Sequence, residues 1–168
     1  MGIMTRWVMA TRIALLAAVT IAAAAQAAFP PPPADWPSGR LPPDVVPQQY
    51  TLDLTILPDQ DRFSGRVAIA VEVSKPLTGF WLHGQGLAVT AAQMVPANGQ
   101  PIAAQYTEVG DEGVAWLALA EELPAGPATL SLEYNAAFGR GLAGLYKVTV
   151  GDDNYAFTQF ESVSGRKA

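Results

Sequence analysis

The sequence predicts an all-β protein: an antiparallel β-sandwich-like domain preceded by a signal peptide and a Pro-rich linker. Two observations support this fold class. From residue 48 onward, apolar and polar residues alternate in short runs, and no stretch shows a helical period. Turn-forming clusters such as Asn98-Gly99 and Asp111–Gly113 separate these runs. A series of about seven to nine short strands with this spacing is typical of a sandwich or barrel.

The composition limits the size of the domain and its chemistry. At 168 residues, with a formal net charge of −5, the chain is long enough for one domain with a proper core. The sequence contains no cysteine, which excludes disulfides and thiolate metal sites. Nucleic acid is excluded as a partner class, because the basic residues form no stripe or patch.

Residues 1–27 are typical of a signal peptide. Arg6 and Arg12 precede an apolar run over residues 13–25, and Ala25-Gln26-Ala27 is a small-x-small cleavage site. We expect cleavage after Ala27 and an exported protein, either periplasmic or secreted. An uncleaved membrane anchor is the alternative, but a span needs about 20 apolar residues and this run has about 13.

Residues 28–47 are Pro-rich, with four consecutive prolines at Pro30–Pro33 and others up to Pro47. Such a stretch favours extended polyproline conformation and lacks the N–H groups of a β-ladder, so we expect a linker. The four prolines could also be a ligand for an SH3-type domain. The composition favours a stiff N-terminus of the mature protein instead.

The expected β domain covers residues 48–168. Its first strand alternates over Tyr50–Ile56, and residues 58–61 turn the chain. The second strand alternates over Val67–Val73 and stops at Pro76. Later strands are marked by apolar residues with the same alternation: Phe80, Leu82, Leu87, Val89, Val114, Trp116, Leu130, Leu132 and Tyr134.

The last strands form a predicted hairpin. Tyr146–Val150 alternates, Gly151–Asn154 is dense in turn formers, and Tyr155–Phe157 is the second arm. This arm delivers the polar segment Thr158–Glu161 from a strand end, where rigid scaffolds place recognition chemistry.

A glycine motif precedes the hairpin. Gly139–Gly144 matches the G-x-G-x-x-G fingerprint of dinucleotide-binding proteins. The fingerprint works only where it opens a helix within a βαβ unit. A strand pattern follows it here, so we interpret the match as chance and the glycines as a tight loop.

His83 is the only histidine in the chain. A zinc site of the H-E-x-x-H type needs two histidines on one helical face plus a further ligand, so we expect no metal site in this chain. We expect His83 to make a structural hydrogen bond at a strand end. The carboxylate pairs all lie in expected turns, where they cap amides and stay solvated: Asp59/Asp61, Asp111/Glu112, Glu121/Glu122 and Asp152/Asp153.

Gln159 and Glu161 are the candidate binding residues. A spacing of two places both side chains on the same side of an extended strand. A carboxylate there suits a primary ammonium, with charge-assisted hydrogen bonds worth about 1.5–3 kcal/mol where water is excluded. On these residues alone, a solvated carboxylate at a strand end is the default interpretation.

The chain also resembles the N-terminal domain of zinc aminopeptidases of the aminopeptidase N type. The most specific match is Gly144-Leu-Tyr146, a short turn, and then Thr158-Gln-Phe-Glu161 with Arg166 five residues later. Weaker matches lie upstream: Leu41–Tyr50, Phe63–Val67 and Trp81–Gly84. The resemblance implies a β-sandwich-like domain. It also implies that Glu161 holds the free α-amino group of a peptide whose N-terminal residue is released, and that Gln159 lines the same pocket.

The chain departs from the family pattern at Ser162 and Gly165, and it stops at Ala168. The resembled family continues into a catalytic domain with Gly-x-Met-x-Asn and H-E-x-x-H motifs. We therefore expect a truncated product or an incomplete gene model that is inactive alone. Zinc is expected in the missing catalytic domain, which would be the partner of this one. The alternative is a free-standing secreted β-sandwich that binds a ligand without catalysis.

Overall fold

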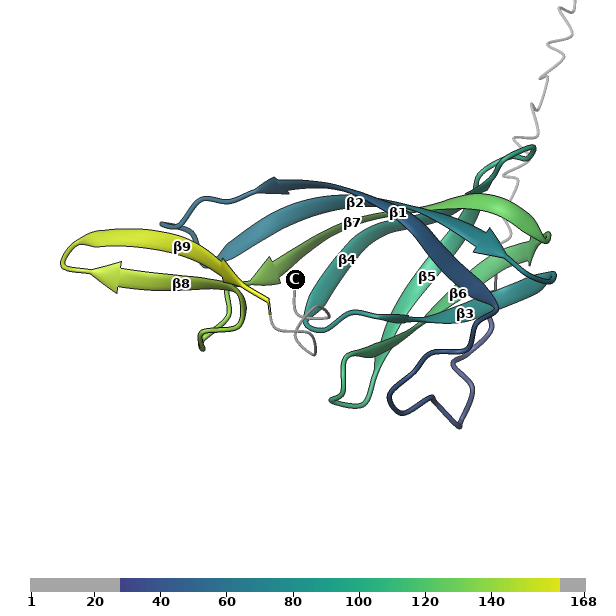
Figure 1. Ribbon diagram of the computed structural model, residues 1–168, viewed down its shortest axis with the longest axis horizontal. Coiled ribbons are helices and arrows are strands. Elements are labelled where there is room, and N and C mark those ends of the chain that lie inside the picture. Colours follow the sequence, from purple (N-terminus) through teal and green to yellow (C-terminus); the bar gives the residue numbers. More distant parts are fainter. Residues whose placement is uncertain (1–27, 161–168) are drawn as a thin grey trace, which may run out of the picture.

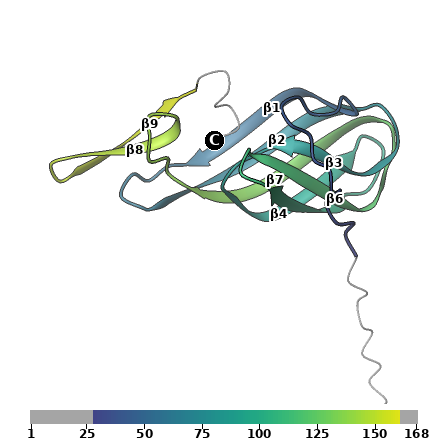
Figure 2. The ribbon, with the colours of Figure 1, turned by 90° about the horizontal axis from the view of Figure 1, so that it is seen from below.

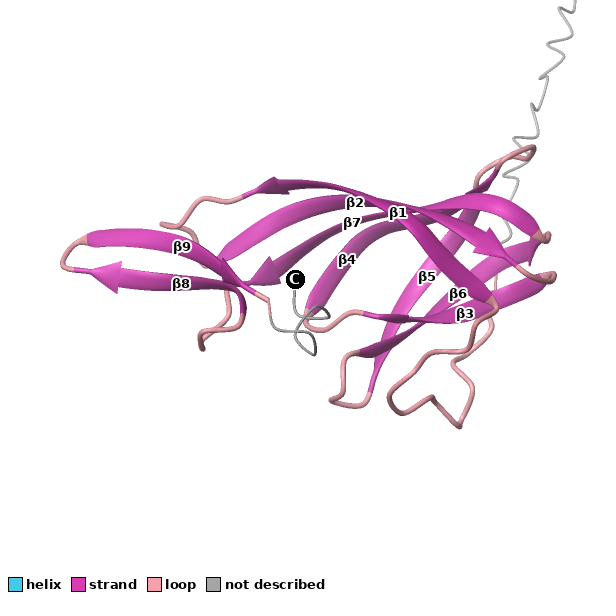
Figure 3. Ribbon diagram, viewed as in Figure 1, coloured by secondary structure: helices cyan, strands magenta, loops and turns pink. Residues whose placement is uncertain are grey.

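The computed structural model describes residues 28–160, which contain strands and no helix (Figure 3). Accordingly, no helix in this part of the chain has the length and hydropathy needed to cross a membrane. The expected signal peptide at residues 1–27 lies outside the described residues. The strands are β1 (Val45–Thr55), β2 (Arg62–Val73), β3 (Leu77–His83), β4 (Leu87–Pro96), β5 (Ile102–Val109), β6 (Val114–Leu123), β7 (Gly126–Ala137), β8 (Gly144–Val150) and β9 (Asp153–Gln159).

Seven strands form one antiparallel sheet in the order β1-β2-β7-β4-β5-β6-β3. Strand β4 pairs with β5 at two positions, Gln93 with Ala103 and Met94 with Ile102, and β5 then continues along β6. The sheet curls at this junction, so that β1 and β2 lie across from β6 and β3 (Figure 1). This curled sheet confirms the predicted all-β, sandwich-like fold class.

The core lies inside the curl. Alternate residues of β2 and β7 point inward and are buried, while their neighbours, such as Arg66 and Glu133, point outward. The main core cluster draws on β2 to β7: Val71, Val73, Phe80, Met94, Ile102, Leu117, Leu119, Leu123, Ala128, Leu130 and Leu132. The strands therefore need no further element to bury this cluster.

A second, aromatic cluster lies at the end of the sheet nearest the hairpin. Phe63 contacts Tyr134 and Phe138, with ring centroids 6.5 and 5.5 Å away. The Tyr134 ring lies over Gly65, its partner in the β2–β7 register. A Cβ at Gly65 would lie 2.6 Å from that ring, so a side chain there would displace the tyrosine.

The Pro-rich segment takes more part in the fold than a linker would. Strand β1 begins at Val45, and Val45–Pro47 pairs with Val71–Val73. The ladder thus extends into the segment expected to be a linker. Proline is tolerated because β1 is an edge strand and its register shifts directly after Pro47. Further upstream, the indole N–H of Trp116 donates a hydrogen bond to the carbonyl oxygen of Pro30 at 3.3 Å.

Strands β8 and β9 form a separate two-stranded sheet. They pair from Gly144 with Gln159 to Val150 with Asp153, and Gly151 turns the chain with a φ of 63°. Figure 2 shows this hairpin projecting from one end of the curled sheet. The predicted hairpin is confirmed, although its second arm runs to Gln159 rather than ending at Phe157.

Candidate functional site

The candidate site lies on the β8–β9 hairpin, which has two different faces. Side chains on successive residues of a strand point to opposite faces. The inward face carries Leu145 and Ala156, which pack against the aromatic cluster of the sheet. The outward face carries Tyr146 and Phe157, whose rings stack with centroids 5.8 Å apart. The exposed Gln159 ends this outward face.

The root of the hairpin is apolar. Leu145 is 5% exposed and contributes to the aromatic cluster. Its carbonyl oxygen accepts a hydrogen bond of 2.8 Å from the backbone N–H of Gly139, which ties β8 to the preceding loop. Strand β8 begins at Gly144, so no helix follows the Gly139–Gly144 motif. The prediction that a strand follows this glycine loop is confirmed.

Two polar side chains, Lys147 and Asn154, connect the hairpin to the turn between β1 and β2, and Thr149 holds Asn154 in place. Lys147 Nζ donates to the carbonyl oxygen of Gln60 at 3.1 Å and lies 3.9 Å from a carboxylate oxygen of Asp61. Asn154 Nδ2 donates to Asp59 Oδ1 at 3.0 Å. Thr149 Oγ1 donates to Asn154 Oδ1 at 2.6 Å. We call this set the polar tether.

The polar tether was not predicted from the sequence, which indicated that Asp59 and Asp61 cap amides and stay solvated in their turn. Asp61 does remain exposed, but Asp59 accepts a hydrogen bond from β9. The sequence held one sign of the tether. Lys147 lies between Tyr146 and Val148 in a strand, so its side chain points to the face opposite to theirs. A lysine on the inward face of a hairpin requires a polar partner.

The structure describes one of the two candidate binding residues. Gln159 is exposed and lies at the end of β9, opposite Gly144. Glu161 lies outside the described residues, so its convergence with Gln159 stays a prediction. Phe160 lines an apolar groove of about 340 Å³ together with Tyr50, Leu52 and others from the inner face of the sheet. The chain thus leaves the hairpin along the open side of the curled sheet.

His83 has the structural role expected of it. Its Nδ1 lies 3.4 Å from the carbonyl oxygen of Gly113, a hydrogen bond when that nitrogen carries the proton. The same carbonyl accepts the backbone N–H of Gly84 at 3.1 Å. Between residues 28 and 160, no three His, Asp or Glu side chains gather as they would to hold a metal ion.

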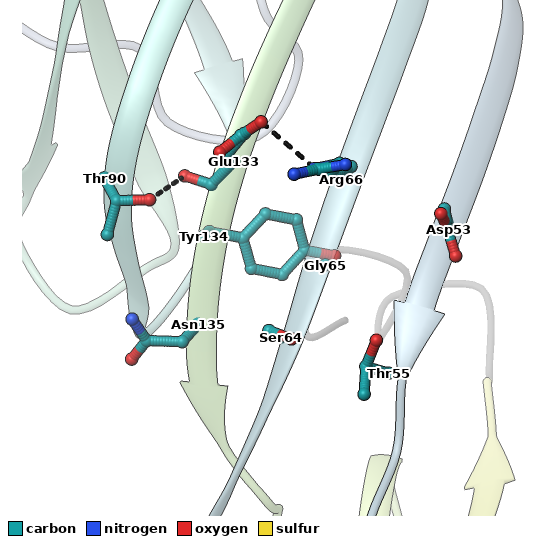
Figure 4. Close-up of a pocket in the computed structure, with 9 residues that line it drawn as sticks. All are labelled: Asp53, Thr55, Ser64, Gly65, Arg66, Thr90, Glu133, Tyr134 and Asn135. Carbon is teal, nitrogen blue, oxygen red and sulfur yellow. Dashed lines mark hydrogen bonds and ion pairs between the residues drawn. The ribbon is translucent and has the colours of Figure 1, made fainter.

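A polar hollow of about 370 Å³ lies on the outward face of the main sheet (Figure 4). Arg66 Nε lies 3.0 Å from a carboxylate oxygen of Glu133, and Thr90 Oγ1 donates to the Glu133 carbonyl at 3.2 Å. The Arg66 and Glu133 side chains are 73% and 51% exposed. An ion pair this exposed to water contributes little binding or folding energy. We therefore interpret the hollow as a solvated face of the sheet.

Tyr106 has the one buried side-chain polar atom without a hydrogen-bond partner in the described part of the chain. Its hydroxyl lies against Gly84, where a Cβ would come within 2.6 Å of it. Burial, and to a smaller extent the nearby Glu108 carboxylate, raises the pKa of Tyr106 above its ordinary value. We therefore interpret the Tyr106 hydroxyl as a structural group of the core.

Comparison with known proteins adds to this geometry. The sequence model described as the peptidase M1 N-terminal domain matches residues 46–168. Mouse glutamyl aminopeptidase is 28% identical over 144 residues, which cover 80% of this chain and 15% of that protein. Aminopeptidase M1-D of rice is 32% identical over 134 residues, covering 76% of this chain and 15% of the relative. The probable M1 family aminopeptidase 1 of Encephalitozoon cuniculi is 32% identical over 128 residues, with coverages of 74% and 14%. The chain therefore spans about 15% of the length of these curated relatives.

Proposed function

This chain belongs to the peptidase M1 N-terminal domain family, and we propose that it is the amine-recognising N-terminal domain of an exported zinc-dependent aminopeptidase. The observation that carries the proposal is the position of Gln159. It stands exposed at the end of a strand whose hairpin is held at an apolar root and at the polar tether. The segment Thr158-Gln-Phe-Glu161 continues from this anchored strand.

The proposed chemistry is recognition of a free peptide N-terminus. The Glu161 carboxylate and the Gln159 amide oxygen are acceptors, and a primary ammonium offers three donors. Such charge-assisted hydrogen bonds contribute about 1.5–3 kcal/mol where water is excluded. Because Gln159 is exposed in this chain, further polypeptide has to cover it before these bonds reach their full strength.

The residues of this chain do not fit a zinc site. Its one histidine, His83, points a ring nitrogen at the Gly113 carbonyl, and the described residues contain no group of three metal-binding side chains. We therefore assign the zinc and the hydrolytic step to polypeptide outside this chain. The contribution of this domain is to bind and orient the substrate amine.

The test is kinetic and uses the product of the complete reading frame. Glu161→Gln should raise KM for aminoacyl substrates and lower kcat/KM by roughly 10- to 100-fold, the equivalent of the lost hydrogen bonds. Asp153→Asn is the matched control, because it removes an exposed carboxylate at the other end of β9. Equal kinetics for wild type and Glu161→Gln would refute the role of Glu161.

A free-standing binding module is the second candidate, and one observation favours it. The curled sheet buries its main core cluster without any element beyond the described strands. Intact-mass measurement of the native protein separates the two candidates. A mass equal to residues 28–168 supports the module, whereas a longer product with an H-E-x-x-H motif supports the aminopeptidase.

A further inference from the structure

The outward face of strands β3 and β6 carries two tryptophans. Leu117 of β6 belongs to the main core cluster, so its neighbours Trp116 and Ala118 point to the opposite face. Trp116 pairs with Trp81 of β3, and the two ring centroids lie 5.0 Å apart at an interplanar angle of 60°. Ala118 is only 1% exposed. This part of the sheet is therefore covered on its outward face as well as inside the curl.

A glycine makes room for the larger part of this aromatic surface. Gly79 of β3 pairs with Ala118, and a Cβ at Gly79 would overlap the ring of Trp116. The Trp116 indole therefore lies over β3, beside Trp81. We call Gly79, Trp81 and Trp116 the tryptophan site.

The Pro-rich N-terminal segment lies against the tryptophan site. Figure 2 shows this segment running past β3 and β6 before β1 begins. The hydrogen bond from the Trp116 indole to the Pro30 carbonyl joins residues that are 86 positions apart in the sequence. Phe29, Pro30 and Pro32 are half-buried, although none of them belongs to a strand. The first residues of the proline run are therefore held against the domain.

The segment and the tryptophan site are chemically complementary. A run of prolines favours the polyproline II helix, whose backbone makes no internal hydrogen bonds. Because proline has no N–H, such a segment offers only carbonyl acceptors and apolar rings. An indole is the matching group, since it is a donor on a large apolar ring. Grooves lined by aromatic residues are accordingly a recurring means of binding polyproline II segments.

We propose that the tryptophan site is a binding site for polyproline II segments, and that Pro30–Pro33 of the same chain is its ligand. This inference is independent of the proposed function. Residues 34–44 connect the ligand to β1, and a short connection of this kind gives an effective concentration on the order of millimolar. The proline run, which the sequence assigned to a linker or to an external SH3-type partner, then has its partner inside the domain.

The first experiment removes the ligand. It uses the protein translated from its complete reading frame, with its N-terminus either at Ala28 or, after trimming, at Ala34. Hydroxyl-radical footprinting with mass spectrometry measures the oxidation of Trp81 and Trp116, and the exposed Tyr155 on the hairpin is the internal reference. We expect several-fold faster oxidation of both tryptophans in the trimmed protein. Equal oxidation in the two proteins would overturn the proposal.

A peptide added in trans tests recognition itself. The peptide with the sequence of residues 28–35, Ala-Phe-Pro-Pro-Pro-Pro-Ala-Asp, should restore protection of both tryptophans in the trimmed protein at a concentration on the order of millimolar. The control peptide has alanine at the four proline positions. It should protect several-fold less, because it is not preorganised. Equal protection by the two peptides would reduce the contact to general apolar packing and overturn the binding site.

A conservative variant tests the donor. Trp116→Phe keeps an aromatic ring and removes the indole N–H, so it should weaken peptide binding, followed through Trp81 oxidation, by roughly 3- to 10-fold. Trp36→Phe is the matched control, because it removes an indole N–H that lies beside Gly110 instead, and it should leave binding unchanged. Equal binding to both variants would contradict the role of Trp116.

Two further measurements keep the test decisive. Hydrogen exchange at the Leu117 amide shows whether the trimmed sheet remains folded. If it does not, Pro31→Ala with Pro33→Ala in the untrimmed protein should raise Trp116 oxidation, and no rise would overturn the proposal. Protection that increases with protein concentration would assign the ligand to a second copy and overturn its assignment to the same chain.

Discussion

The curled sheet and the β8–β9 hairpin are stabilised in different ways. Eleven buried residues from β2 to β7 form the main core cluster of the sheet. The hairpin buries one large side chain, Leu145, and is otherwise held by the polar tether. The sheet thus buries its main cluster with its own strands, whereas the hairpin depends on its neighbours. Recognition groups are commonly carried by such less stable elements on a rigid scaffold.

The largest expected effect comes from shortening one leucine in each region. Leu117→Ala in the sheet should lower the global free energy of unfolding by about 2–5 kcal/mol, because Leu117 is fully buried. Leu145→Ala should instead open the hairpin locally, since its packing is confined to the hairpin root. Urea denaturation measures the first effect, and hydrogen exchange of β8 and β9 amides measures the second. An equal global loss in both variants would mean that sheet and hairpin unfold as one unit.

A smaller effect is expected from the polar tether. Lys147→Met removes the hydrogen bond to the Gln60 carbonyl and should increase opening of the hairpin by about 1 kcal/mol, seen as faster hydrogen exchange in β9. Lys147→Arg keeps a cationic donor and should retain most of the protection.

Lys75→Met is the matched control for the tether. Lys75 pairs with Asp44 at 3.0 Å, away from the hairpin, so its loss should leave exchange in β9 unchanged. If Lys147→Met behaved like this control, the tether would not hold the hairpin.

The smallest effect concerns the sheet alone and depends on pH. Burial raises the pKa of Tyr106, so its neutral hydroxyl is favoured in the folded state. The stability from this shift is present below the unfolded pKa of about 10 and is lost as the pH rises above it. Tyr106→Phe should change stability by less than about 1 kcal/mol at pH 7 and flatten the loss above about pH 10. Some slope should remain, because burial also raises the pKa of Tyr134. Urea denaturation at pH 7 and above pH 10 measures the loss of stability in wild type and variant. An unchanged pH dependence in Tyr106→Phe would contradict the assignment to Tyr106.

Much of the fold could be predicted from the sequence because strand alternation is a local signal. Alternation identified the hairpin and every other strand except β5, in which no residue was marked, and Gly151 marked the turn of the hairpin. Alternation shows which side chains of a strand share a face, but it does not show which strands pair. The placement of β7 between β2 and β4 was therefore not predicted. The start of β1 at Val45 was missed because the edge position that tolerates Pro47 is a property of the complete sheet.

The site was predicted less completely than the fold. The Thr158-Gln-Phe-Glu161 segment placed Gln159 at a strand end, where the structure has it. The polar tether was not predicted because Lys147 and Gln60 are 87 positions apart, and no local sequence pattern indicates that they meet. The outward face of the hairpin was visible as alternation, but the separation of the hairpin from the main sheet was not.

The central place of β7 has a consequence for how fast the domain folds. Strand β2 pairs with β7, and Arg62 reaches Asn135 across 73 positions of sequence. Sheets dominated by such distant pairs fold in milliseconds to seconds, whereas a local hairpin such as β8–β9 forms in about 1–10 μs. Strand β1 can pair with β2 early, but β2 and β4 cannot be joined before β7 has been synthesised.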